Sequence, residues 1–150
     1  MSSRGLSTGS SDPRAQVHIR LWQEWEDQVS RNEFDEYWNE ACTVLDHPAF
    51  RDFFEAGRYD RARNELPILY ALDDRNVYGV IDRLVWRGNE VLLLDYKTHR
   101  ITHAEIGAVA GRFEPQLKLY ADGVRRLWPG TTVRPILIFT ACRQSVELAV

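Results

Sequence analysis

The chain has 150 residues, of which 44% are apolar and 11% aromatic, and its formal net charge is −3. This length and composition are typical of one globular domain and exclude a disordered chain. The N-terminal residues are polar and lack the apolar segment of a signal peptide, and no apolar run is long enough to span a membrane. We therefore expect a cytoplasmic protein with a flexible N-terminal segment, residues 1–14, and a single domain, residues 15–150.

Two further features of the composition bear on function. There are two cysteines, Cys42 and Cys142, which is too few for a four-cysteine iron–sulfur cluster within the chain. Of the 19 basic residues, all except Lys97 and Lys118 are arginine. Arginine suits phosphate contacts because its planar guanidinium binds oxygens in pairs, although a GC-rich genome would produce the same bias.

The first half of the chain predicts helices followed by strands. Apolar residues recur at helical spacing in residues 15–30 and 33–45, and a short helix should follow Pro48 and end near Gly57. The period then changes to that of strands. Three strands are expected, at residues 65–72, 77–86 and 91–97. Gly88-Asn89 predicts a two-residue hairpin loop between the second and the third.

The second half predicts one more helical region and the remaining strands. Thr102 and Glu105 form a capping-box pattern at a helix start, and a second helical stretch begins near Glu114, with Pro115 in its first turn. Residues 132–141 predict a strand, and residues 145–150 would add another. This order indicates an α+β (mixed α/β) fold with a mixed sheet.

The hairpin YGVIDRLVWRGNEVLLLDYKT carries charges among apolar residues. If Gly88 and Asn89 form its loop, Arg87 faces Glu90, and Asp82 lies directly across from Asp95. Side chains alternate along each strand, so one face of the hairpin should carry a single set of residues. That set is Val80, Asp82, Leu84 and Trp86 on one strand and Val91, Leu93, Asp95 and Lys97 on the other.

Two aspartates directly opposite each other destabilise a sheet unless a cation lies between them. Mg²⁺ and Mn²⁺ prefer hard oxygen ligands, often one or two carboxylates with water and substrate phosphate. Lys97 could reach a phosphate oxygen or the attacking water, so the patch suits metal-assisted hydrolysis of a phosphodiester. The alternative is structural: Lys97 neutralises one aspartate, and Arg83 helps to neutralise the other.

Four motifs in this order resemble a known family. They are E-x-P (Glu65–Pro67), G-x-I-D-R (Gly79–Arg83), D-Y-K-T (Asp95–Thr98) and Q-L-x-L-Y (Gln116–Tyr120). From about residue 45 onward the chain resembles the PD-(D/E)xK nucleases, and in particular the RecB/AddA-type nuclease domain. The resemblance implies a restriction-endonuclease-like core: a central mixed sheet of four to five strands, flanked by helices, in αβββαβ order.

The resemblance also implies roles for residues of this chain. Asp82 and Asp95 would be metal ligands, with the backbone carbonyl of Tyr96 as another, and Glu65 would bind or orient the metal through water. Lys97 would position or polarise the attacking water. The remaining members of the implied site are Gln116, Tyr120 and His18.

The helix residues and the histidine each have a second interpretation. Gln116 and Tyr120 would brace the lysine and contact DNA near the scissile phosphate, although Tyr120 suits core packing equally well. His18 matches a histidine of the family's first helix that binds metal, whereas a lone helix histidine is more often structural. The family's tyrosine three residues before the glutamine is Phe113 here.

Three functions follow as hypotheses. The first is a Mg²⁺- or Mn²⁺-dependent DNA nuclease of exonuclease type, acting on single strands or DNA ends in repair and recombination, with a partner helicase and no membrane association. The second is a non-catalytic module of the same fold that binds DNA or a helicase. The third is a small structural protein whose hairpin charges are ion-paired.

Overall fold

The computed structural model describes residues 13–150, and the chain forms two units, Met1–Cys42 and Thr43–Val150. The predicted flexible segment, residues 1–14, therefore lies almost entirely outside the described residues. Its last two residues, Pro13 and Arg14, belong to a helix. The elements in chain order are α1 (Pro13–Trp25), α2 (Arg31–Asp46), η1 (Pro48–Phe50), α3 (Arg51–Phe54), β1 (Arg61–Leu72), β2 (Arg75–Arg87), β3 (Glu90–Lys97), η2 (His103–Glu105), α4 (Ile106–Leu127), β4 (Thr132–Phe139) and β5 (Gln144–Glu147).

The first unit contains α1 and most of α2. Ser30 and Glu33 begin α2 with reciprocal hydrogen bonds: the Ser30 amide donates to Glu33 Oε2 at 3.1 Å, and the Glu33 amide donates to Ser30 Oγ at 3.2 Å. Two amides at the helix start are satisfied in this way. Phe34 is buried and contacts the rings of Trp22 and His18, so aromatic side chains hold the two helices together.

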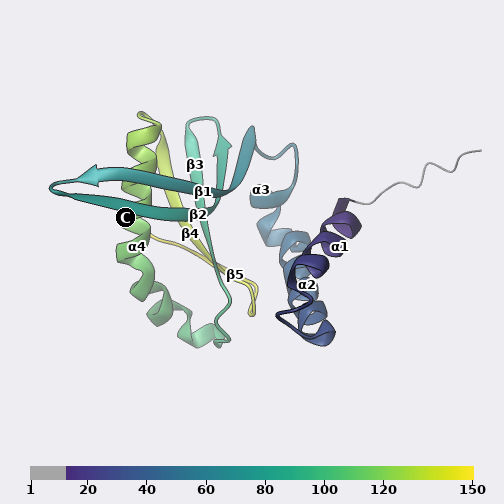
Figure 1. Cartoon of the computed structure of the whole chain (residues 1–150). Helices are drawn as coiled ribbons and strands as arrows, with labels where there is room; N and C mark the ends of the chain where they lie inside the picture. The colour runs from purple at the N-terminus through teal and green to yellow at the C-terminus, as the bar shows by residue number, and fades with distance from the viewer. Residues whose placement is uncertain (1–12) are drawn as a thin grey trace, which may run out of the picture. The chain divides into compact units, whose positions relative to one another are not determined.

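The second unit is built on a five-stranded sheet in the order β1-β2-β3-β4-β5 (Figure 1). Strands β3 and β4 are parallel and all other neighbours are antiparallel, so the predicted mixed α+β sheet is confirmed. Parallel neighbours require a crossover connection, which α4 supplies between β3 and β4. The predicted capping box is also present: the Thr102 amide donates to Glu105 Oε1 at 3.1 Å.

Each face of the sheet carries its own core. On one face α4 buries Leu117, Ala121 and Val124 against strand residues that include Ile81 and Leu84. The opposite face is covered by Val44 of α2 and by the aromatic residues of η1 and α3. This second core contains Val44, Phe50, Val85, Leu92, Leu94, Ile136 and Ile138. The sheet is therefore the middle layer of the second unit.

The helix after β3 differs from the prediction. Two helical stretches were expected, with Pro115 in the first turn of the second, whereas α4 is continuous and contains Pro115 in its interior. An interior proline costs about 3 kcal/mol because its nitrogen donates no hydrogen bond and its ring crowds the preceding turn. Ile106 and Val109 before Pro115, like Leu117 after it, pack into the same core, and burying several such side chains outweighs that cost.

The alternation of side chains along β1 and β2 breaks at one level. Ala62 packs on the α3 face and Leu66 on the α4 face, although alternation would place both on one face. Between them Glu65 has a φ of 51°, in the left-handed region that is uncommon for residues other than glycine, and it drops out of the β1–β2 pairing. On β2, Ile81 and Leu84 likewise both pack against α4.

This irregularity corrects one part of the predicted face. Val80 was expected to share the face of Leu84, but Val80 is exposed and its neighbour Ile81 is buried there instead. The irregularity lies at the level of Asp82, where the regular pairing of β2 with β3 has ended. The backbone therefore bends at the level where the charged residues were predicted to meet.

Candidate active site

The predicted hairpin register is confirmed. Arg87 pairs with Glu90 across the Gly88-Asn89 loop, and the ladder continues in the same register to Arg83 and Leu94. The next level is that of Asp82 and Asp95. Instead of continuing the ladder, the Tyr96 amide donates to Asp82 Oδ2 at 2.8 Å. The two strands thus separate at the point where their carboxylates face each other.

The two carboxyl groups lie close enough to affect each other's ionisation. Burial raises the pKa of Asp82 to about 6, the Tyr96 amide opposes that rise, and the neighbouring Asp95 adds to it. Asp95 is itself buried. The pair is therefore an acidic site whose second negative charge is costly at neutral pH unless a cation offsets it.

Lys97 lies beside this pair. Its Nζ is 2.7 Å from Asp95 Oδ2, and the two side chains are only 14% and 9% exposed. The same Nζ lies 3.9 Å from the centre of the Phe113 ring, which comes from α4. One ammonium group thus contacts a carboxylate on β3 and an aromatic ring on the helix that covers it.

Helix α4 presents Phe113, Gln116 and Tyr120 on one face, since residues spaced by three and four positions lie together on a helix. Gln116 Nε2 donates to the Tyr120 hydroxyl at 3.2 Å. Burial raises the pKa of Tyr120, and the charge of Asp95 raises it further, which places the phenol in the field of the acidic pair. The Tyr120 ring packs against the core, as its structural interpretation expects, and its proposed contact with DNA stays a prediction.

Gly79 is the residue that the sequence reasoning passed over. A Cβ atom at Gly79 would collide with the ring of Tyr120, and even the hydroxyl oxygen of that ring would lie only 3.0 Å from it. A glycine inside a strand is a known sign of such a close approach, so the signal was present in the G-x-I-D-R motif. Gly79 allows the Tyr120 ring to approach the backbone of β2 closely.

We expect Gly79→Ala to displace Tyr120 and to lower the free energy of unfolding by about 1–3 kcal/mol, the usual cost of overpacking. Gly107→Ala is the matched control, because a Cβ at Gly107, in α4, meets nothing within 4 Å. Urea denaturation of both variants measures the difference. Equal stability of the two variants would show that the Tyr120 ring does not pack on Gly79.

For the other predicted residues of the second unit, the structure shows their positions but no metal-ligand role. Glu65 lies level with Asp82 across the β1–β2 pairing and is exposed. Among the described residues, no three His, Cys, Asp or Glu side chains are arranged so that they could hold a metal ion together. Tyr96 contributes its amide to the site, as a donor to Asp82, and its role as a carbonyl ligand remains a prediction.

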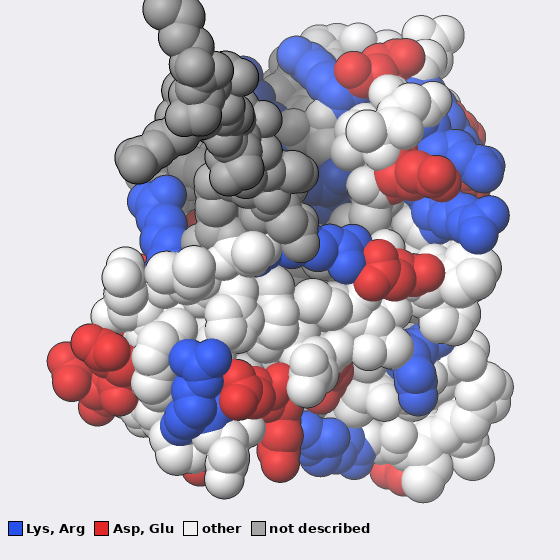
Figure 2. Space-filling view, turned by 90° about the vertical axis from the view of Figure 1, so that its right-hand side faces the viewer, with Lys and Arg blue, Asp and Glu red and all other residues white. Residues whose placement is uncertain are grey.

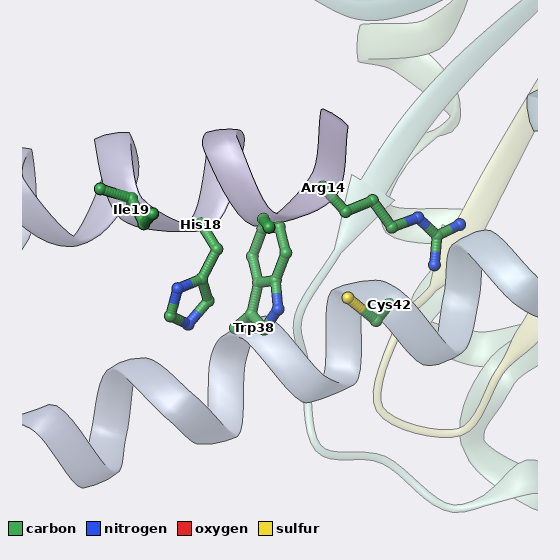
Figure 3. Close-up of a pocket in the computed structure, with 6 residues that line it drawn as sticks. Arg14, His18, Ile19, Trp38 and Cys42 are labelled. Carbon is green, nitrogen blue, oxygen red and sulfur yellow. The ribbon is translucent and has the colours of Figure 1, made fainter. Parts of the chain in front are cut away.

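His18 lies in the first unit, in a pocket of about 410 Å³ between α1 and α2 (Figure 3). Its Nε2 is 3.9 Å from a carboxylate oxygen of Asp35, and its ring meets those of Phe34 and Trp38 edge-on. These contacts fit the structural interpretation of a helix histidine. His18 belongs to the first unit and the acidic pair to the second, so the metal-ligand role of His18 stays a prediction.

Arg83 does not neutralise Asp82 in the way that the structural alternative supposed. Its buried guanidinium donates to the Phe53 carbonyl at 3.0 Å, to Asn64 Oδ1 at 2.8 Å and to the Tyr59 hydroxyl at 3.2 Å. These bonds join α3 and β1 to β2. Of the two cations that this alternative invoked, only Lys97 forms an ion pair with the aspartates.

A family profile described as the PD-(D/E)XK nuclease superfamily matches residues 4–146. The match covers most of the chain, including β1 to β4 in full and β5 except for its last residue, Glu147. The chain belongs to the PD-(D/E)XK nuclease superfamily. Its mixed five-stranded sheet with flanking helices is the restriction-endonuclease-like fold that the motifs implied.

One curated relative supports the RecB/AddA-type assignment within this superfamily. The chain is 33% identical over 87 residues to an ATP-dependent helicase/nuclease subunit of Limosilactobacillus fermentum (strain NBRC 3956 / LMG 18251). The match covers 53% of this chain but only 6% of the relative. The chain thus corresponds to a small part of a much larger protein, and the whole relative's activities do not transfer to it.

The described part of the chain contains no helix with the length and apolar character needed to cross a bilayer.

Lys, Arg, Asp and Glu side chains are interspersed on the face shown in Figure 2. That face therefore presents both signs of charge rather than one extended basic surface.

Proposed function

We propose that this PD-(D/E)XK protein is a Mg²⁺- or Mn²⁺-dependent DNA nuclease of exonuclease type. The observation that supports this function best is the facing pair Asp82 and Asp95 with Lys97 at 2.7 Å from Asp95. A cytoplasmic location and a place in DNA repair or recombination belong to the same proposal.

The donor set fits a divalent cation. Two carboxylates lie close enough to affect each other's ionisation, and burial first, then the neighbouring Asp95, raises the pKa of Asp82. Mg²⁺ is often bound by one or two carboxylates, with water and substrate phosphate completing its shell, so two protein ligands suffice. When bound, such a cation supplies Lewis-acid stabilisation of negative charge on the phosphate.

The residues of the chain would perform the other tasks. Asp82 and Asp95 would hold the cation, with Glu65 and the Tyr96 carbonyl as further candidate ligands. Lys97 would orient the attacking water and offset the charge that develops on the phosphate as the 3′-oxygen leaves. Gln116 and Tyr120, joined by their hydrogen bond, would contact the DNA strand beside the scissile phosphate.

The net charge favours dependence on a partner. Phosphate contacts supply most of the affinity of proteins for DNA, and a chain with a net charge of −3 gains little from its overall field. A partner helicase that delivers a DNA end would remove the need for strong independent binding. The similarity to part of a helicase/nuclease supports such a partner.

We expect the protein to degrade end-labelled linear DNA with Mg²⁺ or Mn²⁺ and to leave it intact in EDTA. Comparing linear with circular single-stranded DNA tests the exonuclease assignment, since a circle offers no end. The length ladder of products gives the direction of degradation. Cleavage of linear DNA in EDTA would contradict a metal-dependent mechanism.

The second candidate is the non-catalytic module, and the same assay separates it from the first. A folded protein that cleaves neither substrate with either metal but shifts labelled DNA in a gel would be a DNA-binding module. Retention of Asp82, Asp95 and Lys97 together favours the nuclease, because a module that only binds needs none of the three.

A further inference from the structure

The side chain of Lys97 is held from two directions. Asp95, two residues earlier on β3, contacts its Nζ at 2.7 Å, and the face of the Phe113 ring lies 3.9 Å from the same atom. Only 14% of the lysine side chain is exposed, so little water competes for the ammonium group. An ammonium over an aromatic face is attracted by the negative charge of the ring, and more strongly when it is shielded from water.

Phe113 is well placed to keep this contact. It is half-buried, packs against the core beneath α4, and lies on the helix face that also carries Gln116. The ring of His99, from the loop after β3, lies 5.5 Å from its centre. Phenylalanine has no hydroxyl group, so the ring itself is the only part of the side chain that can attract Lys97.

The two partners of Lys97 differ in one respect that matters for catalysis. Asp95 is also a proposed metal ligand, and a carboxylate that serves a divalent cation attracts a neighbouring ammonium less strongly. The ring of Phe113 is not a metal ligand, so a bound cation would not weaken its attraction for Lys97. Phe113 is therefore the partner that can hold the lysine in place while Asp95 is engaged.

We propose that Phe113 is a positioning residue, which fixes the Lys97 ammonium beside the acidic pair through the face of its ring. This inference rests on the proposed nuclease function, since Lys97 would act on water and phosphate and Phe113 only on Lys97. It assigns a role to the one motif position at which this chain departs from the resemblance.

The contact itself can be tested without any activity. The chain contains only two lysines, and the second, Lys118, is exposed on α4 and serves as an internal reference. In protein labelled with ¹³C-lysine, we expect the Hε and Cε signals of Lys97 to lie upfield of those of Lys118 because of the ring current of Phe113. A Lys118→Arg variant assigns the two sets.

Substitutions at position 113 then show whether the ring is responsible. Phe113→Leu should move the Lys97 signals to the position of Lys118, whereas Phe113→Tyr should keep them upfield. Coincident lysine signals in the unsubstituted protein would overturn the proposal. So would an upfield shift that persists in folded Phe113→Leu protein.

The effect on the reaction needs a readout that packing alone would not change. Fluorinated phenylalanines weaken the negative face of the ring with little change in shape. We expect the single-turnover rate of DNA cleavage to fall with each added fluorine at position 113, by about 2- to 30-fold over the series. The same series at Phe50, which is buried on the opposite face of the sheet, is the control and should leave the rate unchanged.

The outcomes separate this inference from the proposed function. If the enzyme is active and its cleavage rate does not change with fluorine at position 113, the positioning role of Phe113 is overturned. The proposed nuclease function would still stand. If the protein is inactive, adding Mn²⁺ to the ¹³C-lysine-labelled sample tests whether Lys97 lies at a metal site. Broadening of the Lys97 signals beyond those of Lys118 would support a lysine held at a metal site, and equal broadening would overturn both ideas.

Discussion

We expect Lys97→Ala to lower the rate of metal-dependent DNA degradation by about 100- to 1000-fold, the usual cost of removing one group that stabilises developing charge. Asp82 and Asp95 remain in this variant, so metal should still bind, and the loss should appear in the rate of cleavage. Initial rates on end-labelled DNA at saturating Mn²⁺ measure it. Activity close to that of the unsubstituted protein would remove Lys97 from the mechanism.

Two controls make the result specific. Lys118→Ala changes the other lysine of the chain, which is exposed on α4, and should leave the rate unchanged. Lys97→Ala also leaves Asp95 buried without its ion-pair partner, which destabilises proteins when the carboxylate stays charged. Thermal melting should therefore accompany each assay, and Lys97→Met, which keeps the apolar stem, provides a second variant if the alanine variant unfolds.

The second large effect concerns stability. We expect Asp82→Asn to raise the melting temperature of the metal-free protein by about 2–4 °C at pH 7.5, corresponding to about 1 kcal/mol after allowance for the partial exposure of this side chain. The asparagine removes a costly charge and keeps an oxygen that can accept the Tyr96 amide. Without the Asp82 carboxylate, Mn²⁺ should no longer raise the melting temperature.

The pH dependence of stability has a definite sign. The pKa of Asp82 rises from 3.8 to about 6 in the folded protein, so folding favours its protonated form. Its contribution to stability is therefore fully present below about pH 4 and is lost as the pH rises through 6. Asp82→Asn should abolish this part of the pH dependence, which melting curves between pH 4 and pH 8 would show.

The exposed Asp74, in the turn between β1 and β2, provides the matched control. Asp74→Asn removes one negative charge without touching the acidic pair and should leave both the pH dependence and the response to Mn²⁺ unchanged. The structural alternative differs in its response to metal. If the hairpin charges are only ion-paired, Asp82→Asn costs little or even stabilises the fold, and Mn²⁺ does not raise the melting temperature of the unsubstituted protein.

The parts of the fold that the sequence predicted correctly depend on local rules. A two-residue loop at Gly88-Asn89 leaves one register for its hairpin, and the pairing follows that register from Arg87 and Glu90 to Arg83 and Leu94. The capping box at Thr102 is equally local, because both partners lie within one turn. The mixed α+β sheet followed from the order of helices and strands along the chain, whereas the parallel pairing of β3 with β4 was not predicted.

The parts that were missed depend on contacts between distant segments. Nothing near Glu65 marks it as a residue with positive φ; the packing of Leu66 and Ile81 against α4 shifts both strands. Pro115 suggests a helix start, and only the core on both sides of it shows that the helix continues. The approach of Phe113 to Lys97 joins α4 to β3, a pairing that no local pattern reveals.

The irregular level at Glu65 and Asp82 has a consequence for folding. The strands β1, β2 and β3 follow one another through tight turns, so closing them costs little chain entropy, whereas β4 joins only after the long connection through α4. We expect the facing carboxylates to come together while water still surrounds and screens them. Their repulsion would then become costly only when α4 docks, which places the penalty late in assembly.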